Sequence, residues 1–586
     1  MSTFDLVIKN ATIVDGSRMP RFYGDLAIKH GRIERIGVNI PTDRAARVIE
    51  AGGKIVAPGV IDIHTHYDAQ LHWDPLCTGS SWHGATTAVL SNCGFGFAPC
   101  RPQDRGRYMQ MMENTEQIPT SAMVAGMNWD WESFPDWMAH LARQAKGVNL
   151  AAYVPLNALL LYVAGNNFAK GRALSATEKA RARDILHHSL DAGAIGFSMI
   201  HLGTTNSHVD FDGSPMPTDV MAIEDAHVLA EVLRERDQGI IQITADTAGA
   251  AENRHVSAEL ARIARRPVLH NVVFASGLHP DHHRTVLGWI DKTAAEGVNL
   301  FGQGGTFRAW LEFNALDFNG WDSDPNWSRL STAGDRTDKL RLVGDPAYRT
   351  MMRREYDPKK LGASGSIESF ELINAQGVVP YVAFEGRTMG DISSTLGQHV
   401  VDFFFDLLIA TNLEADFTTG EVISYDTDSV AEILANPRVL PGISDSGAHS
   451  KFYNGAQYPT DLITWMVRDE ARLSLEDAHY KLSGLPAHVL SLDQRGLLRE
   501  GYAADLYIYD FDALDYVRGR YDVLHDTPGG HYRRVVRAQG ISHVIVNGEL
   551  ILENTVATGN LPGRLVANGG AALDARINAP AAMAGA

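Results

Sequence analysis

The chain has 586 residues, enough for one large domain or several, and with 45% hydrophobic and 21% charged residues it has the composition of a globular protein. This composition excludes global disorder, collagen and coiled coil. The formal charge of −18 disfavours nucleic acid and anionic membranes as partners, and leaves a small molecule as the expected one.

Cysteine usage and the N-terminus indicate the compartment. The three cysteines (Cys77, Cys93 and Cys100) cannot form a disulfide framework in a chain of this length. The first residues show no basic region followed by an apolar run, and apolar runs such as 151–165 fall short of a bilayer span. We expect a cytoplasmic protein that binds neither membranes nor nucleic acid and forms a homo-oligomer.

Short β-prone runs separated by turns mark both ends of the chain. They cover residues 5–9, 25–29, 32–36, 505–510 and 543–552. Within the last run, Asn547-Gly548 is a strong signal for a two-residue hairpin. We predict that both ends form one small β-sandwich domain (1–57 and 489–562), and that an Ala/Gly-rich tail follows (563–586).

Between these ends, apolar strand-like runs alternate with amphipathic helical stretches. The runs cover residues 60–64, 86–91, 148–154, 194–199, 240–243, 267–273 and 298–301. Helix-capping signals at Ser175 and Ser474 support the alternation. The pattern predicts an α/β fold, a (β/α)₈ TIM-like barrel over residues 58–488, with a doubly wound sheet as the rival. Residues 316–358 break the alternation and are expected to be an insertion.

The first strand of the predicted barrel ends in His64-Thr-His66. On a strand, side chains two residues apart share a face, so both imidazoles can point at one ion. A pair of hydrogen-bonded histidines is the alternative.

The next strand ends in Ser-Asn-Cys93-Gly. A thiolate at this position can bind or bridge zinc. A small buried residue beside a turn glycine is the alternative.

The last strand ends in Ser-Asp445-Ser-Gly. A carboxylate at this position can bind a metal and act as general base and then general acid, although a turn or cap Asp is also common. In a closed barrel the first and last strands are neighbours, which would bring Asp445 next to the two histidines.

Together these motifs resemble the amidohydrolase superfamily, and within it the N-acyl-D-amino-acid deacylase (D-aminoacylase-like) branch. The resemblance rests on residues 58–66, 84–94 and 444–449, and it continues through 481–487, 495–505 and 546–549. Cys93 follows His64 by 29 positions, similar to the spacing between the paired histidines and the metal-bridging cysteine of that branch. The resemblance implies that a zinc-activated water attacks an amide carbonyl and that Asp445 shuttles the proton.

The chain also departs from that branch. The fifth-strand run 239–246 lacks the histidine that the branch places there. On the sixth strand, His270 is a metal-ligand candidate, but it shares a face with Val268 and Val272, so a hydrogen-bonded core histidine is the alternative. The arginine and lysine that hold a substrate carboxylate in D-aminoacylases are not evident. The candidates for substrate binding are His201, Ser446, His449 and Lys451.

We therefore predict a zinc-dependent hydrolase that cleaves a non-peptide C–N amide bond of an N-acyl amino acid or a related N-acyl or aryl amide. Asp445 is the catalytic residue, and His64, His66, Cys93, Asp445 and His270 are the metal-ligand candidates. These candidates predict one firm Zn²⁺ site, and a second, weaker site is the alternative to a single ion. The alternatives are a cyclic amide or imide hydrolase of the same superfamily, and a non-catalytic binding protein that retains the fold.

Overall fold

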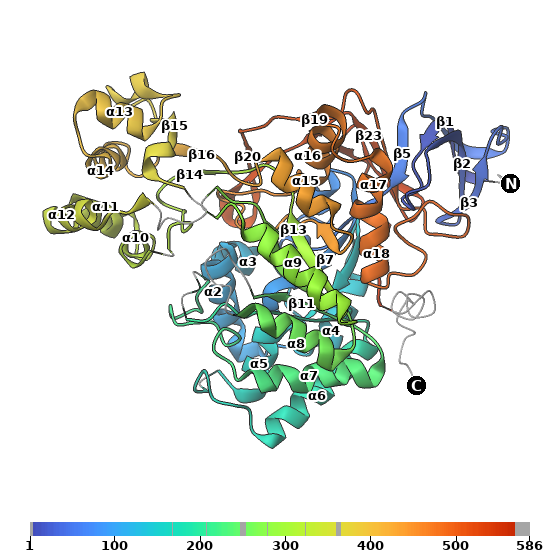
Figure 1. Cartoon of the computed structure of the whole chain (residues 1–586), viewed down its shortest axis with the longest axis horizontal. Coiled ribbons are helices and arrows are strands. Elements are labelled where there is room, and N and C mark those ends of the chain that lie inside the picture. Colours follow the sequence, from blue (N-terminus) through green and yellow to red (C-terminus); the bar gives the residue numbers. More distant parts are fainter. Residues whose placement is uncertain are drawn as a thin grey trace.

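The computed structural model describes residues 4–166, 168–204, 206, 208–245, 253–277, 279–322, 324–358 and 365–568. Mixed α/β structure fills these ranges, and Figure 1 shows a helix-rich centre with a β-sheet at one side and a lobe of helices at the other. None of the helices in these ranges is both long and apolar enough to cross a membrane.

Two parallel sheets form the centre of the molecule. The first has the order β6-β7-β8, and the second has the order β17-β13-β12-β11-β10-β9. Their strands are β6 (Val60–Asp62), β7 (Ala85–Leu90), β8 (Asn149–Ala152), β9 (Val154–Pro155), β10 (Gly196–Ile200), β11 (Ile240–Thr244), β12 (Val268–Phe274), β13 (Leu300–Gly305) and β17 (Val439–Pro441). Only Tyr153 separates β8 from β9, and a parallel bridge joins Thr65 to Ser446 beyond the ends of β6 and β17.

Helices follow most of these strands and cover the sheets. They include α5 (Leu156–Ala164), α6 (Ala176–Asp191), α7 (Ile223–Arg236), α8 (Arg254–Ala264), α9 (His282–Ala295) and α15 (Thr427–Ala435). The predicted capping box is present at α6, where Ser175 and Glu178 exchange hydrogen bonds, and Ser474 caps α17 (Leu475–His479). Parallel strands with covering helices have both faces buried, which explains their continuous apolar runs.

Strands from the two ends of the chain lie in one sheet. Its order is β25-β24-β23-β18-β5-β1-β2-β3, with β4 paired to β1. The N-terminal strands are β1 (Phe4–Ile13), β2 (Phe22–Lys29), β3 (Arg32–Gly37), β4 (Ala45–Glu50) and β5 (Ile55–Pro58); the C-terminal ones are β18 (Leu506–Tyr509), β23 (Ile541–Val546), β24 (Glu549–Glu553) and β25 (Val556–Ala557). Asn547 and Gly548 both have positive φ, the conformation that a two-residue turn between β23 and β24 requires.

The insertion is longer than the predicted 316–358. Its aromatic core contains side chains from Phe313 to Phe417 and also Phe452 from the loop after the last strand, and Figure 1 shows the insertion as a separate lobe. It contains β14 (Ala309–Phe313), α10 (Pro325–Ser331), α11 (Arg336–Gly344), α12 (Pro346–Glu355), β15 (Glu371–Asn374), α13 (Met389–Leu396), α14 (Val400–Ala410) and β16 (Asp416–Ile423). The pattern of the helix Val400–Ala410 matches that of a helix covering the central sheet, so its place in the lobe could not be read from the sequence.

The first residues of the predicted loose tail (563–586) pack against the rest of the molecule. Leu565 and Val566 are buried, and the backbone N–H of Val566 donates to the carbonyl of Leu150. Apolar side chains thus fix this part of the chain against the end of the central sheet. Residues 569–586, on which the rest of the tail prediction falls, lie outside the described ranges.

Candidate metal centre

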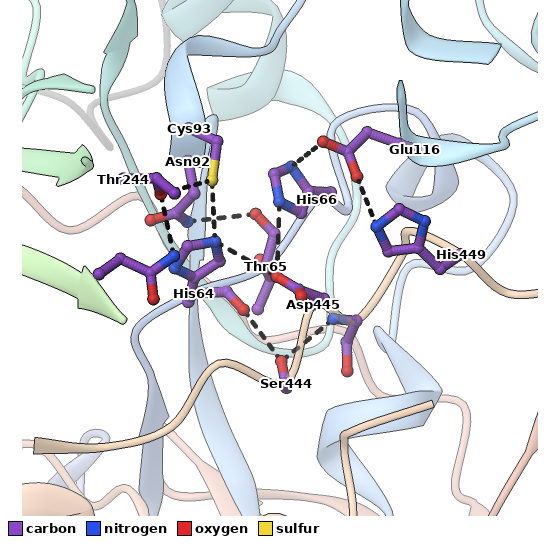
Figure 2. A network of polar contacts seen from close by, with 12 residues as sticks. His64, Thr65, His66, Asn92, Cys93, Glu116, Thr244, Ser444, Asp445 and His449 are labelled. Atoms are coloured by element: carbon purple, nitrogen blue, oxygen red, sulfur yellow. Dashed lines mark hydrogen bonds and ion pairs between the residues drawn. The ribbon is translucent and has the colours of Figure 1, made fainter. Parts of the chain in front are cut away.

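His64 and His66 follow strand β6 and point toward the same atom. Their rings are 5.5 Å apart, and both side chains are almost fully buried. The Nε2 atoms of His64 and His66 lie 3.3 and 3.7 Å from Oδ1 of Asp445. Two imidazole nitrogens and a carboxylate oxygen therefore converge, as Figure 2 shows.

Cys93 reaches the same point from the end of β7. Its Sγ lies 3.2 Å from Nε2 of His64, and ligand atoms of His64, His66 and Cys93 all lie within 4.8 Å of one another. The backbone turns sharply here, because Ser91 and Cys93 both have positive φ. The turn directs the thiol toward the histidines instead of along the strand.

Asp445 is held by the backbone next to the two histidines. Its N–H donates to the carbonyl of His64 at 3.2 Å, and the N–H of His66 donates to the carbonyl of Ser446 at 2.8 Å. At Gly447, with φ of 94°, a Cβ would lie 2.6 Å from the carbonyl carbon of His66. Only glycine permits this approach, which explains why Gly follows Asp445-Ser446.

Burial sets the protonation of these groups in the absence of an ion. It lowers the pKa of His64 to about 4 and that of His66 well below its usual value, so both imidazoles are neutral, the form that binds metals. Burial raises the pKa of Asp445 to about 7 and that of the Cys93 thiol well above its usual value. A cation at this point would favour the charged forms of both groups.

The donor set fits a zinc ion. Neutral imidazole, thiolate and carboxylate are the ligands that zinc prefers, and the three clustered side chains are almost fully buried. Nδ1 of His64 lies 3.2 Å from the amide oxygen of Gln303, which favours a proton on Nδ1 and leaves the Nε2 lone pair for a metal.

The fifth and sixth strands contribute amides and a hydroxyl. Thr244, the last residue of β11, has its Oγ1 3.3 Å from Sγ of Cys93, and it accepts a hydrogen bond from Nδ2 of Asn271 on β12 at 2.9 Å. Gln242 accepts from the backbone N–H of Cys93 at 2.7 Å. These strands therefore surround the thiol with hydrogen-bonding groups.

The structure does not bring His270 to the cluster. Its Nδ1 is 2.9 Å from Oγ of Ser257 on α8, and its ring packs 4.9 Å from that of Trp289 on α9. His270 therefore faces the covering helices, while its neighbour Asn271 faces Thr244. Adjacent residues of a strand point to opposite faces. A shift of one residue in register therefore decides whether a histidine on this strand faces the metal centre or packs in the core.

The four substrate-binding candidates occupy different environments. Nδ1 of His201 is 2.7 Å from the carbonyl oxygen of Thr218. Ser446 pairs with His66 through its backbone, and its hydroxyl is buried. His449 lies 3.5 Å from the carboxylate of Glu116. Nζ of Lys451 lies 3.8 Å from the centre of the Tyr532 ring and 3.7 Å from Asp317.

Sequence reasoning missed Glu116, the last residue of α2 (Arg105–Glu116). It is 1% exposed and lies between His66 and His449 (Figure 2). Burial and the neighbouring carboxylates Asp445 and Asp68 raise its pKa well above the usual value. A signal was present, because Glu116 falls on the buried stripe formed by Tyr108, Met111, Met112 and Thr115.

The chain is similar to known proteins over most of its length. The profile of the Amidohydrolase family matches residues 47–277 and 351–552. The N-acyl-D-aspartate deacylase of Alcaligenes xylosoxydans xylosoxydans is 27% identical over 574 residues, which cover 97% of this chain and 96% of that protein.

Two solved structures share the fold. One is the N-acyl-D-glutamate deacylase from Bordetella bronchiseptica complexed with zinc and a phosphonate inhibitor, with a TM-score of 0.65, 23% identity and coverage of 96% of this chain and 99% of that one. The other is a D-aminoacylase with a binuclear metal centre, with a TM-score of 0.64, 21% identity and coverage of 96% and 100%.

Proposed function

Because the chain belongs to the amidohydrolase family, we propose that it is a zinc-dependent hydrolase that removes the acyl group from an N-acyl-D-amino acid. The observation that carries this proposal is the convergence of His64, His66, Cys93 and Asp445 at the ends of β6, β7 and β17. The full-length similarity to an N-acyl-D-aspartate deacylase supports this class of substrate.

We infer that the central strands form a (β/α)₈ barrel. In support, β8 and β9 are separated by one residue, and the Thr65–Ser446 bridge links the first and last strands. One buried cluster also contains side chains from most of these strands, among them Ile61, Val89, Ile240, Leu269 and Leu440. We further propose that the sheet of the two chain ends is a β-sandwich domain, and that 58–488 is the catalytic domain.

In the proposed reaction His64, His66 and Cys93 hold the ion, and Asp445 holds and moves the proton. When bound, zinc acidifies water and polarises the amide carbonyl. Asp445 takes a proton from the attacking water as the C–O bond forms, and then gives this proton to the amine nitrogen as the C–N bond breaks and the amine departs. The carbonyl of His64 fixes the Asp445 backbone, which keeps the carboxylate within 3.3 Å of Nε2 of His64.

The proposal has a direct test. The purified protein is assayed for zinc by mass spectrometry, stripped with a chelator, reloaded, and screened against N-acyl-D- and N-acyl-L-amino acids, hydantoins, lactams and aryl amides. We expect about one tightly bound zinc per chain and turnover of the D-amino-acid derivatives that depends on the metal. Activity that survives removal of the metal contradicts the mechanism. Turnover of cyclic amides alone would favour a cyclic amide hydrolase, and neither zinc nor turnover would favour a binding protein.

We also propose that the enzyme is a cytoplasmic homo-oligomer. The three cysteines, all unpaired and buried in the structure, suit a reducing compartment. Light scattering during gel filtration measures the oligomeric state, and a monomer at micromolar concentration would contradict the second part of this proposal.

A further inference from the structure

A buried carboxylate links the metal centre to the loop after the last strand. Glu116 places Oε1 3.6 Å from Nδ1 of His66 and Oε2 3.5 Å from Nε2 of His449 (Figure 2). Its backbone carbonyl accepts the N–H of His449 at 2.7 Å. The end of helix α2 is thus joined to both the first-strand histidine and the last-strand loop.

We propose that Glu116 is a positioning residue for the metal ligand His66, an inference that rests on the proposed zinc chemistry. Nε2 of His66 faces Asp445, so Nδ1 is the nitrogen left for an outer partner. Nδ1 is buried and has no hydrogen-bond partner in the described structure, and Glu116 lies slightly beyond hydrogen-bond distance from it. Accepting the Nδ1 proton would fix the tautomer whose Nε2 lone pair points at the ion.

The two ligand histidines have different outer partners. His64 faces the neutral amide oxygen of Gln303, whereas His66 faces the carboxyl group of Glu116. A bound cation would favour the ionised form of Glu116 as it does that of Asp445. An ionised carboxylate increases the basicity of an imidazole ligand more than an amide does, because its charge stabilises the Nδ1 proton. Glu116 therefore strengthens the His66 bond to the ion in particular.

His449 also links Glu116 to the insertion. Its ring lies 5.5 Å from that of Phe452, which in turn lies 5.1 Å from Phe318 in the aromatic core of the lobe. His449 is thus assigned to support Glu116, and the chain of contacts from the insertion to the ion runs through Phe452, His449, Glu116 and His66.

The test measures zinc affinity by competition with a chromophoric chelator, independently of turnover. Glu116→Gln keeps the shape and removes the charge, so we expect zinc to bind about 10- to 100-fold more weakly. Glu113→Gln is the matched control on the exposed side of the same helix and is expected to bind zinc as the wild type does. The visible spectrum of the cobalt-substituted enzyme should change in Glu116→Gln and stay unchanged in the control.

The outcomes separate the roles. Unchanged zinc affinity in a folded Glu116→Gln variant overturns the inference. If turnover falls in that variant while zinc affinity stays unchanged, Glu116 acts on the substrate and not on His66. Complete loss of zinc would make Glu116 a ligand and also overturn it. If Glu116→Gln does not fold, His449→Leu serves instead: a smaller loss of affinity supports the chain of contacts, and no loss overturns it. Failure of the wild type to bind zinc would refute the proposed function itself.

Discussion

The two walls of the candidate metal centre differ in chemistry. The wall made by the first, second and last strands carries imidazole, thiol and carboxyl groups (His64, His66, Cys93 and Asp445), whereas the wall made by the fifth and sixth strands carries Gln242, Thr244 and Asn271. Ligand atoms therefore gather on one wall, and the other wall provides hydrogen bonds to the thiol and to the backbone N–H of Cys93. This difference favours one strongly held ion, and it predicts unequal effects of substitutions on the two walls.

The largest effect is expected from removing both histidines of the first wall. His64→Asn with His66→Asn eliminates two of the three clustered ligands, so bound zinc should fall to near zero and turnover to the assay background. Mass spectrometry of metal content and an amide assay measure the two quantities. Stoichiometric zinc in this double variant would show that the ion binds elsewhere.

The next largest effect is expected at Asp445. In Asp445→Asn the amide cannot accept and return a proton, so turnover should fall by about 10²- to 10⁴-fold. Zinc content should stay close to that of the wild type, because His64, His66 and Cys93 remain. Full activity of this variant would exclude Asp445 as the general base.

A smaller effect is expected on the second wall at Thr244. Thr244→Val keeps the shape and removes the hydroxyl beside the Cys93 sulfur, a hydrogen bond worth about 0.5–1.5 kcal/mol. Zinc affinity should therefore fall by roughly 2- to 12-fold, which competition with a chelator resolves. Thr244→Ser keeps the hydroxyl and is the matched control; equal affinity in all three proteins would show that the contact with the thiol is unimportant.

No effect on the metal is expected from His270→Gln. This side chain faces α8 and α9, so zinc content should be unchanged while the free energy of unfolding falls by about 1–3 kcal/mol, because the buried bond to Ser257 is disturbed. Urea unfolding and metal analysis measure both. Loss of zinc from a folded His270→Gln would place this histidine in the centre and remove the contrast between the walls.

Much of the fold could be predicted from the sequence because its signals are local. Alternating strand and helix patterns, the Ser175 cap and the Asn547-Gly548 turn depend on residues a few positions apart. The extent of the insertion could not be predicted, because the apolar pattern of Val400–Ala410 does not reveal whether it packs on the central sheet or on the aromatic core of the lobe.

By itself the sequence determined which chemical groups stand at the ends of the strands: His64, His66, Cys93 and Asp445 each follow an apolar run, and side-chain alternation already predicted a common direction for the two histidines. Only the tertiary structure decided which distant groups meet them. Glu116 lies at the end of a helix and contacts His66, and Thr244 lies next to the Cys93 thiol. His270 faces the covering helices and not the metal centre, because a register difference of one residue places a side chain on the opposite face of the strand. Long-range packing fixes these choices.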